Sequence, residues 1–245
     1  MRILALDAAS AAISAALLED GRILAHRFEA MERGHAERLM PMVVAVMSGV
    51  PWSCLDAVAV SVGPGSFTGI RVGLAAARGI GLALGIPVVG VTTFEAVARA
   101  AAPAPAPGRR LLAVVESKRR EIYVQLLDER QRPLAEPKAL APEDIARYVG
   151  PGPIDVAGDG AARVAAALTS AGLDASLASV PATPDAARVA EAAFERLRAE
   201  GPPAHAARPL YLRPPDVTVP GQGSTTTGPT AGPATGPTKV PSGRR

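Results

Sequence analysis

Apolar runs of strand length and longer segments of helical periodicity alternate along the first hundred residues. Residues 2–8, 12–18 and 22–30 are predominantly apolar, and a Glu-Asp-Gly turn joins the last two runs. They predict three strands in a meander. The following segments alternate between the two types: 34–48 (helix), 57–62 (strand), 67–84 (helix), 87–91 (strand) and 94–102 (helix). Antiparallel strands therefore come first, and parallel strands with crossover helices follow.

The pattern starts again after an Ala/Pro run at 102–108, which predicts an extended spacer. A shorter series of similar order follows: strands 111–116, 122–127 and 154–157, and helices 142–149, 161–171 and 183–200. The element order resembles the ribonuclease H-like half-domain of the actin, hexokinase and Hsp70 ATPases. We therefore expect a bilobal α/β fold of two similar subdomains, 1–102 and 110–213, joined by a linker at 103–109. The pattern does not decide which lobe the last helix packs on.

Composition and charge separate residues 214–245 from the rest. This segment is dominated by Gly, Pro and Thr and has few apolar residues, so we expect a disordered tail. It carries a formal charge of +2 out of the total of +3, which leaves about +1 for residues 1–213. That near-neutral balance is not typical of a chain that binds nucleic acid by itself. We interpret Arg109-Arg110 and Lys118-Arg119-Arg120 as solvated charges.

Targeting and redox signals are sparse. The single cysteine, Cys54, excludes an internal disulfide and suits a reducing cytosol. The apolar start of the chain is too short for a signal peptide. The longest apolar region, 72–91, is interrupted by Arg78 and by several glycines and a proline, so a membrane span is not expected.

A glycine-rich loop, Gly63-Pro-Gly-Ser-Phe-Thr-Gly69, lies between a predicted strand and a predicted helix. Such a loop could bind an anion on free N–H groups, or it could dock the helix closely. The Lys-Ser/Thr of a Walker loop is missing, and the glycine spacing does not fit the dinucleotide fingerprint. Related ATPases also have a phosphate turn, Asp-x-Gly-Thr/Ser, in the first hairpin; here the turn at 7–10 has Ala9 in place of the glycine. Both observations argue against intrinsic ATP hydrolysis.

Small residues recur at every fourth position of the predicted helix 67–84 and just beyond it: Gly69, Gly73, Ala77, Gly81 and Gly85. A glycine inside a helix costs about 1 kcal/mol relative to Ala, so we expect a close contact to compensate. The other sides are apolar, interrupted only by Arg71 and Arg78 on one side. A helix that is apolar nearly all round must be covered nearly all round. We expect a partner protein to cover part of it.

The preceding helix supports this interpretation, because four of the five methionines lie in 31–47 and methionine-rich surfaces adapt to partners. We therefore predict a partner interface on the two helices. Its predicted residues are His35, Leu39, Met42, Val43, Val46, Phe67, Gly69, Arg71, Gly73, Leu74, Ala77 and Arg78.

Catalytic chemistry has little support in the sequence. The only histidines are His26, His35 and His205, and the positions one turn on either side of His35 are Met31 and Leu39. A metal pair on a helix would need a second histidine or a carboxylate there. We interpret His35 as a helix-start or packing residue, and we assign no catalytic, cofactor-binding or metal-binding residue.

Several motifs in this chain match one family. They are Ile3–Ala8, His35–Met42, Val62–Gly73 and Gly85–Thr92, followed in matching order by Glu116–Tyr123, Gly158–Gly160 and Pro209–Arg213. On these residues the chain resembles the TsaB (YeaZ) family, bacterial partner subunits in threonylcarbamoyladenosine (t6A) synthesis on tRNA. The resemblance covers about 1–213. Glu116-Ser-Lys departs from the Asp-Ala-Arg of many members.

The resemblance implies an actin-like accessory subunit that is not an enzyme by itself. Members bind and activate the transferase TsaD through their N-terminal-lobe helices, or pair with another copy as a homodimer. TsaE joins the assembly, tRNA is reached indirectly through the complex, and ATP or ADP would bind only at the shared interface. No intrinsic cofactor and a cytoplasmic location are expected. Two alternatives remain, a kinase or ATPase of the actin-like superfamily and an M22-type peptidase.

Overall fold

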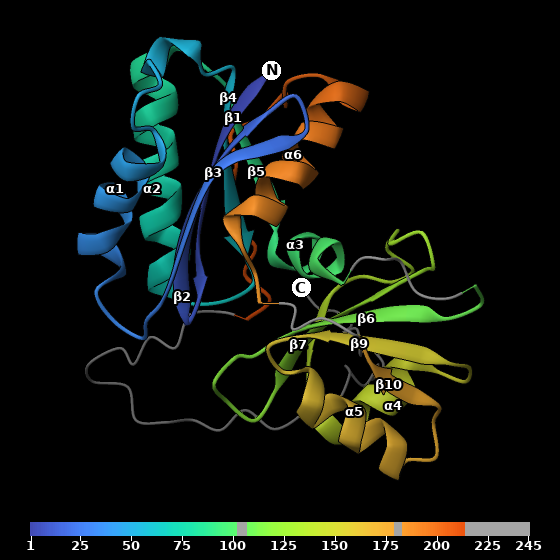
Figure 1. Cartoon of the computed structure of the whole chain (residues 1–245). Coiled ribbons are helices and arrows are strands. Elements are labelled where there is room, and N and C mark those ends of the chain that lie inside the picture. Colours follow the sequence, from blue (N-terminus) through green and yellow to red (C-terminus); the bar gives the residue numbers. More distant parts are fainter. Residues whose placement is uncertain (102–106, 179–182, 214–245) are drawn as a thin grey trace, which may run out of the picture. The chain divides into compact units, whose positions relative to one another are not determined.

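The computed structural model describes residues 1–101, 107–178 and 183–213. Most of the predicted linker and all of the predicted tail lie outside the described residues. Two five-stranded sheets, each accompanied by helices, make up the described part (Figure 1). The expected α/β fold with two similar mixed sheets is confirmed.

The first sheet has the strand order β3-β2-β1-β4-β5. Its strands are β1 (Arg2–Ser10), β2 (Ala12–Glu19), β3 (Arg22–Ala30), β4 (Ala57–Gly63) and β5 (Val88–Thr92). The first three strands pair antiparallel, and β1–β4 and β4–β5 pair parallel. β1 and β4 are buried along nearly their whole length, since helices cover both faces, and this explains their continuous apolar sequences.

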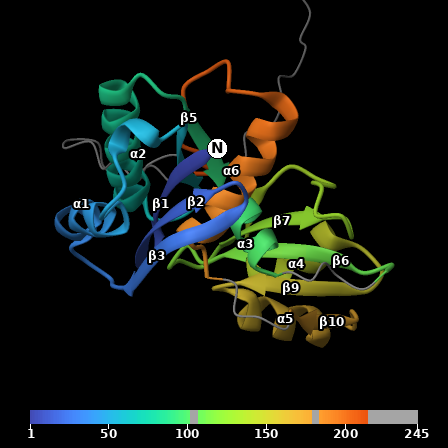
Figure 2. The ribbon, with the colours of Figure 1, turned by 45° about the horizontal axis from the view of Figure 1, so that its top comes forward.

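Helices α1 (His35–Val46) and α2 (Phe67–Leu84) lie on one face of this sheet, and α6 (Ala186–Glu200) lies on the other (Figures 1 and 2). The last helix thus returns to the first sheet, although it follows the second sheet in the chain. Its alanine-rich face, including Ala190 and Ala193, packs on Ile3 and Ala5 of β1. Small side chains allow the helix to approach the sheet closely.

The second sheet has the order β10-β9-β6-β7-β8. Its strands are β6 (Arg110–Val115), β7 (Ile122–Leu127), β8 (Lys138–Leu140), β9 (Ile154–Gly158) and β10 (Ala175–Leu177), with helices α4 (Pro142–Val149) and α5 (Ala161–Ser170). Side chains of α3 (Thr93–Ala100) join the apolar cluster of β6. The sequence did not predict β8, β10 or the 3₁₀ turn Trp52–Cys54, because three residues are too few to show a periodic pattern.

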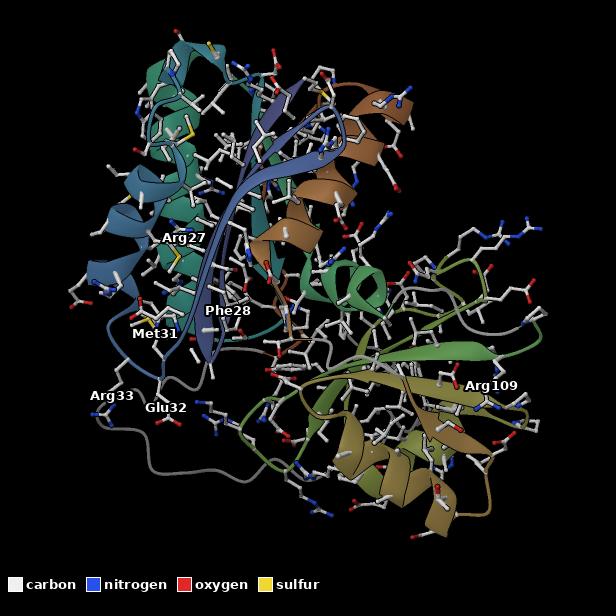
Figure 3. The ribbon with its side chains drawn as sticks, viewed as in Figure 1. Arg27, Phe28, Met31, Glu32, Arg33 and Arg109 are labelled. Carbon is white, nitrogen blue, oxygen red and sulfur yellow. The ribbon has the colours of Figure 1, made fainter. Side chains whose placement is uncertain are left out.

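The expectation that Arg109 and Arg110 are solvated charges is wrong. The Arg109 Nε donates to Asp155 Oδ1 at 2.7 Å, and its side chain is only 21% exposed (Figure 3). Arg110 Nη1 donates to the Val149 carbonyl at 2.7 Å. Both guanidinium groups therefore join the start of β6 to neighbouring segments of the second lobe. Glu32 and Arg33, in contrast, project outward from the connection between β3 and α1 (Figure 3).

Candidate functional site: helices α1 and α2 and the loop between β4 and α2

The glycine-rich loop lies directly on the turn that follows Asp7. The Ser66 N–H donates to the Ala9 carbonyl at 2.7 Å, and the Ser66 hydroxyl caps α2 by accepting from the Gly69 N–H. A Cβ added to Gly65 would lie 2.1 Å from the Ala9 oxygen, and one added to Gly69 would lie 1.9 Å from the Ala8 oxygen. These glycines therefore permit close approach of two backbone segments. Of the two uses left open by the sequence, the geometry favours helix docking.

The small-residue face of α2 turns toward the chain's own sheet. A Cβ on Gly73 would contact Val60 of β4 at 3.4 Å, and one on Gly81 would lie 2.5 Å from a methyl group of Val88. Ala77 is fully buried in the same core. The close contact that compensates for the helical glycines is thus internal. The expectation that this face meets a partner is wrong.

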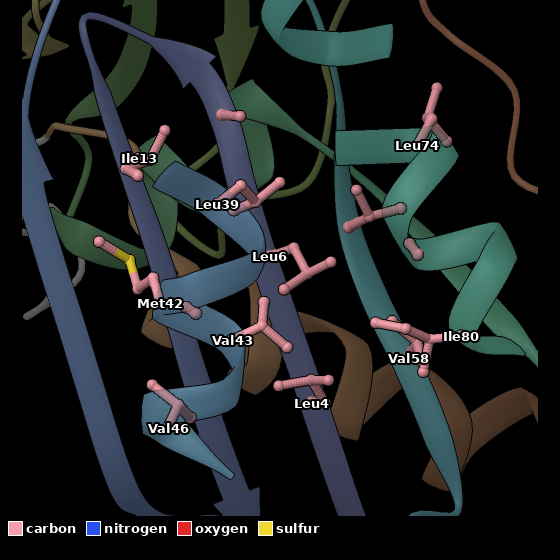
Figure 4. Close-up of a cluster of buried hydrophobic side chains, with 14 of the residues drawn as sticks. Leu4, Leu6, Ile13, Leu39, Met42, Val43, Val46, Val58, Leu74 and Ile80 are labelled. Carbon is pink, nitrogen blue, oxygen red and sulfur yellow. The ribbon is translucent and has the colours of Figure 1, made fainter. Parts of the chain in front are cut away.

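Most residues of the predicted interface lie in the protein core. The buried ones are Leu39, Met42, Val43, Val46, Gly69, Gly73, Leu74 and Ala77. Figure 4 shows the apolar side chains of α1 and α2 directed at Leu4 and Leu6 of β1 and at Val58 of β4. These eight residues fix the two helices on the sheet and present no side chain to a partner. His35 is half-buried, while Phe67, Arg71 and Arg78 are exposed.

The exposed face of the two helices is mostly apolar or small. On α2 it includes Ala75, Gly79 and Leu82, of which Leu82 is 86% exposed. On α1 the exposed residues Met40 and Val44 face outward, and Val44 is 59% exposed. We call these five residues the outer face. Of the four methionines noted in this region, Met42 and Met47 are buried and Met31 is partly buried, so only Met40 belongs to it.

Helix α2 has the length and composition of a membrane span, and it is the only such helix among the described residues. Its inner side is nevertheless packed on β1 and β4 in the core of the first sheet. The core position accounts for its apolar character on that side. The exposed side is not explained by the fold.

Two aromatic rings and an arginine cluster at the start of α2. The Arg71 guanidinium lies 3.6 Å from the centroid of the Phe67 ring, and its Nε donates to the Tyr211 hydroxyl at 3.0 Å. The Phe67 and Tyr211 rings are 5.4 Å apart. Phe67 and Arg71 belong to the interface predicted from the sequence, but Tyr211, which is 140 positions away from Arg71, does not. The only signal for Tyr211 was its place in the 209–213 motif.

Asp7 is the most perturbed titratable group of this lobe. Its side chain is fully buried at the end of β1, and its Oδ2 has no hydrogen-bond partner among the described residues. Burial raises the pKa of this carboxyl to about 6, although the nearby Ser61 hydroxyl and the Ala9 N–H oppose the shift. The neutral acid is therefore stabilised relative to an ordinary aspartate.

The histidines and carboxylates do not form a recognisable metal site in the part of the chain that the structure describes. His35 is the first residue of α1, and its Nε2 lies 3.2 Å from the Ser10 carbonyl oxygen, which agrees with a helix-start role. His26 Nε2 lies 2.8 Å from Asp185 Oδ1, and Asp185 caps α6. Both histidines thus connect elements of the first lobe.

Several known proteins similar to this chain are named for threonylcarbamoyladenosine synthesis on tRNA. A family model described as tRNA N6-adenosine threonylcarbamoyltransferase (TsaD) matches residues 23–215. The tRNA threonylcarbamoyladenosine biosynthesis protein TsaB of Escherichia coli is 40% identical over 125 residues, which is 50% of this chain and 53% of that protein. A tRNA N6-adenosine threonylcarbamoyltransferase of Erythrobacter litoralis is 44% identical over 72 residues, 29% of this chain and 21% of that protein.

Among solved structures, YeaZ from Pseudomonas aeruginosa superposes with a TM-score of 0.69 at 31% identity. That match covers 86% of this chain and all of the other. The sequence matches, in contrast, span only about half the length of the first curated relatives.

Proposed function

Because the chain belongs to the TsaB (YeaZ) family, we propose that it is a non-catalytic partner subunit in t6A synthesis that binds and activates the transferase TsaD. The uncovered outer face of α1 and α2 carries this proposal. Water-exposed Leu82 and Val44 are unfavourable on an isolated surface, and contiguous apolar patches mark interaction sites.

The inner side of the same helices supports such a role. Both helices are fixed on the sheet by buried side chains, so the outer face is presented on a rigid support. Ala75 and Gly79 are small, and small exposed residues permit close approach of a second helix. A preorganised surface loses little conformational entropy when a partner binds.

We further propose how the remaining components join. TsaE and tRNA would meet this subunit within the complex, in the cytoplasm, and ATP or ADP would bind only at the shared interface. The glycine loop supports this division, because the Ser66 and Gly69 N–H groups already donate to acceptors of the chain itself. A homodimer through the same outer face would compete with TsaD.

The test is a double substitution on the outer face, Val44→Glu with Leu82→Glu. Both side chains are more than half exposed, so the variant should fold with an unchanged melting temperature while it loses co-elution with the TsaD of the same organism. The matched control is Leu177→Glu, which introduces a charge at a 55% exposed leucine of β10. A folded double variant that still binds TsaD with unchanged affinity would refute the proposal.

Calorimetry separates this function from the kinase or ATPase alternative. The isolated chain should give no heat of binding with ATP and Mg²⁺. Tight binding with turnover would favour the enzyme instead.

A further inference from the structure

Two aromatic rings and an arginine continue the outer face to the start of α2. Phe67, Arg71, Ala75 and Gly79 follow one another at intervals of four residues, so they lie along one side of the helix, and all four are exposed. Tyr211 joins this row from a distant part of the chain, because its ring centroid lies 5.4 Å from that of Phe67. We call Phe67, Arg71 and Tyr211 the aromatic cluster.

The exposed large apolar side chains of the described residues gather on this side of the first lobe. Five of the nine belong to the outer face or to the aromatic cluster: Met40, Val44, Phe67, Leu82 and Tyr211. The other four are spread over β3, β10 and the loop between β7 and β8. Single exposed apolar residues are common, whereas a group of them on one surface marks an interaction site.

Tyr211 is held in place by its neighbours in the chain. The Leu210 N–H donates to the Val62 carbonyl at 2.8 Å. On the other side, Leu212 packs against the apolar cluster formed by α3 and β6. The backbone that carries Tyr211 is therefore attached to both lobes, and its side chain is presented from a fixed position.

The hydroxyl of Tyr211 in turn orders the rest of the aromatic cluster. It accepts a hydrogen bond from the Arg71 Nε at 3.0 Å, and the Arg71 guanidinium lies 3.6 Å from the centroid of the Phe67 ring. Both rings nevertheless remain 40% exposed. Since such contacts contribute little to stability at an exposed site, the fold alone does not account for this arrangement.

We propose that the aromatic cluster forms one end of the TsaD-binding surface, where an apolar patch of TsaD covers the two rings, and that Tyr211 positions Arg71 and Phe67 for this contact. The inference rests on the proposed function and adds a positioning residue from the distant segment 205–213. Exposed rings become more stable when apolar surface covers them. Aromatic residues and arginine are enriched among the residues that dominate binding energy, and side chains that are already ordered lose little entropy on binding.

A double-mutant cycle in the full chain tests the role of Tyr211. The variants are Tyr211→Phe, Arg71→Gln and their combination, each titrated with the TsaD of the same organism. Tyr211→Phe removes only the hydroxyl, and we expect the dissociation constant to rise about three- to tenfold. In the presence of Arg71→Gln the same change should have little further effect, because the side chain that the hydroxyl orders is already missing.

Phe67→Ala tests the ring contact itself. We expect the dissociation constant for TsaD to rise about tenfold or more. Phe28→Ala is the matched control, because Phe28 is 44% exposed on β3. It pairs with Ser14, whose hydroxyl accepts from the start of α6 on the other face of the sheet, so its removal should leave TsaD binding unchanged. Urea unfolding of both variants separates binding from stability.

Three results would overturn the inference. Equal effects of Tyr211→Phe with and without Arg71→Gln would show that Tyr211 does not act through Arg71. Unchanged TsaD affinity of Phe67→Ala, together with lost binding by Val44→Glu/Leu82→Glu, would exclude the aromatic cluster and leave the proposed function standing. Weaker self-association of Phe67→Ala in sedimentation, with unchanged TsaD affinity, would assign the rings to a second copy of the chain. If the outer-face variant also binds TsaD normally, the proposed function fails as well.

Discussion

At the residue scale, Asp7 is a buried carboxyl group whose ionised form destabilises the fold. Its pairing position on β1 faces Ser14 of β2, and its fully buried side chain forms no ion pair with a cation among the described residues. Removing an ionised carboxylate from water is unfavourable, so the native state retains the proton to a higher pH than the unfolded chain does.

Asp7→Asn is therefore expected to make the free energy of unfolding less dependent on pH. The pKa of Asp7 is raised from 3.8 to about 6 in the folded protein. Its contribution to stability is therefore fully present below pH 4 and is lost as the pH rises to about 6. The loss amounts to about 2–3 kcal/mol, and the asparagine variant should lack it. Urea unfolding at several pH values measures the difference.

Glu29→Gln provides a control of opposite sign. Hydrogen bonding to Arg38 lowers the pKa of Glu29. The glutamate therefore stabilises the fold above its unfolded pKa and ceases to do so as the pH falls. If the free energies of unfolding of Asp7→Asn and of the natural chain change in parallel with pH, the buried carboxyl is not the source of the pH dependence.

At the element scale, sequence periodicity predicted the longer helices and strands well. Helix α2 was predicted at 67–84 and is found at Phe67–Leu84. The apolar pattern could not tell which side of α2 is internal, because this helix is apolar on both sides. For this reason the small-residue face of α2 was wrongly assigned to a partner. Close packing against the chain's own sheet and close packing against a second protein require the same small residues.

Two glycines of α2 provide a matched test of this correction. Gly69→Ala places a Cβ against the Ala8 carbonyl oxygen and should destabilise the protein by about 1–3 kcal/mol. Gly79→Ala meets no atom within 4 Å and should stabilise it by up to about 1 kcal/mol through helix propensity. Chemical denaturation of both variants gives the two signs. Equal effects would show that the inner side of α2 is not in close contact with the sheet.

At the scale of the whole molecule, the sequence predicted two lobes but not the path of the chain between them. Residues 205–213 return from α6 to the first sheet and continue to the second. Ala207 is buried in the core of the first lobe, Leu210 N–H donates to the Val62 carbonyl at 2.8 Å, and Arg213 pairs with Glu121 at 2.9 Å. These contacts join residues far apart in sequence, so no local sequence pattern predicts them.

The same segment contributes to fold stability and also contacts Arg71 and Arg78 beside the proposed partner-binding surface, and truncation tests both contributions. A chain that ends after Arg213 keeps all of these contacts and should match the full chain in melting temperature and in TsaD affinity. A chain that ends after Pro203 loses the buried Ala207 and the Leu210 hydrogen bond, so its free energy of unfolding should fall by about 2 kcal/mol or more.

The shorter chain also loses the acceptors that hold Arg71 and Arg78. Under conditions where it remains folded, we expect it to bind TsaD more weakly, because the two arginines must then be ordered during binding. Tyr211→Phe in the full chain isolates this contribution, since it removes only the hydroxyl that accepts from Arg71 and keeps the ring stacked near Phe67. A shorter chain that is folded and binds as tightly as the full chain would show that residues 205–213 act on stability alone.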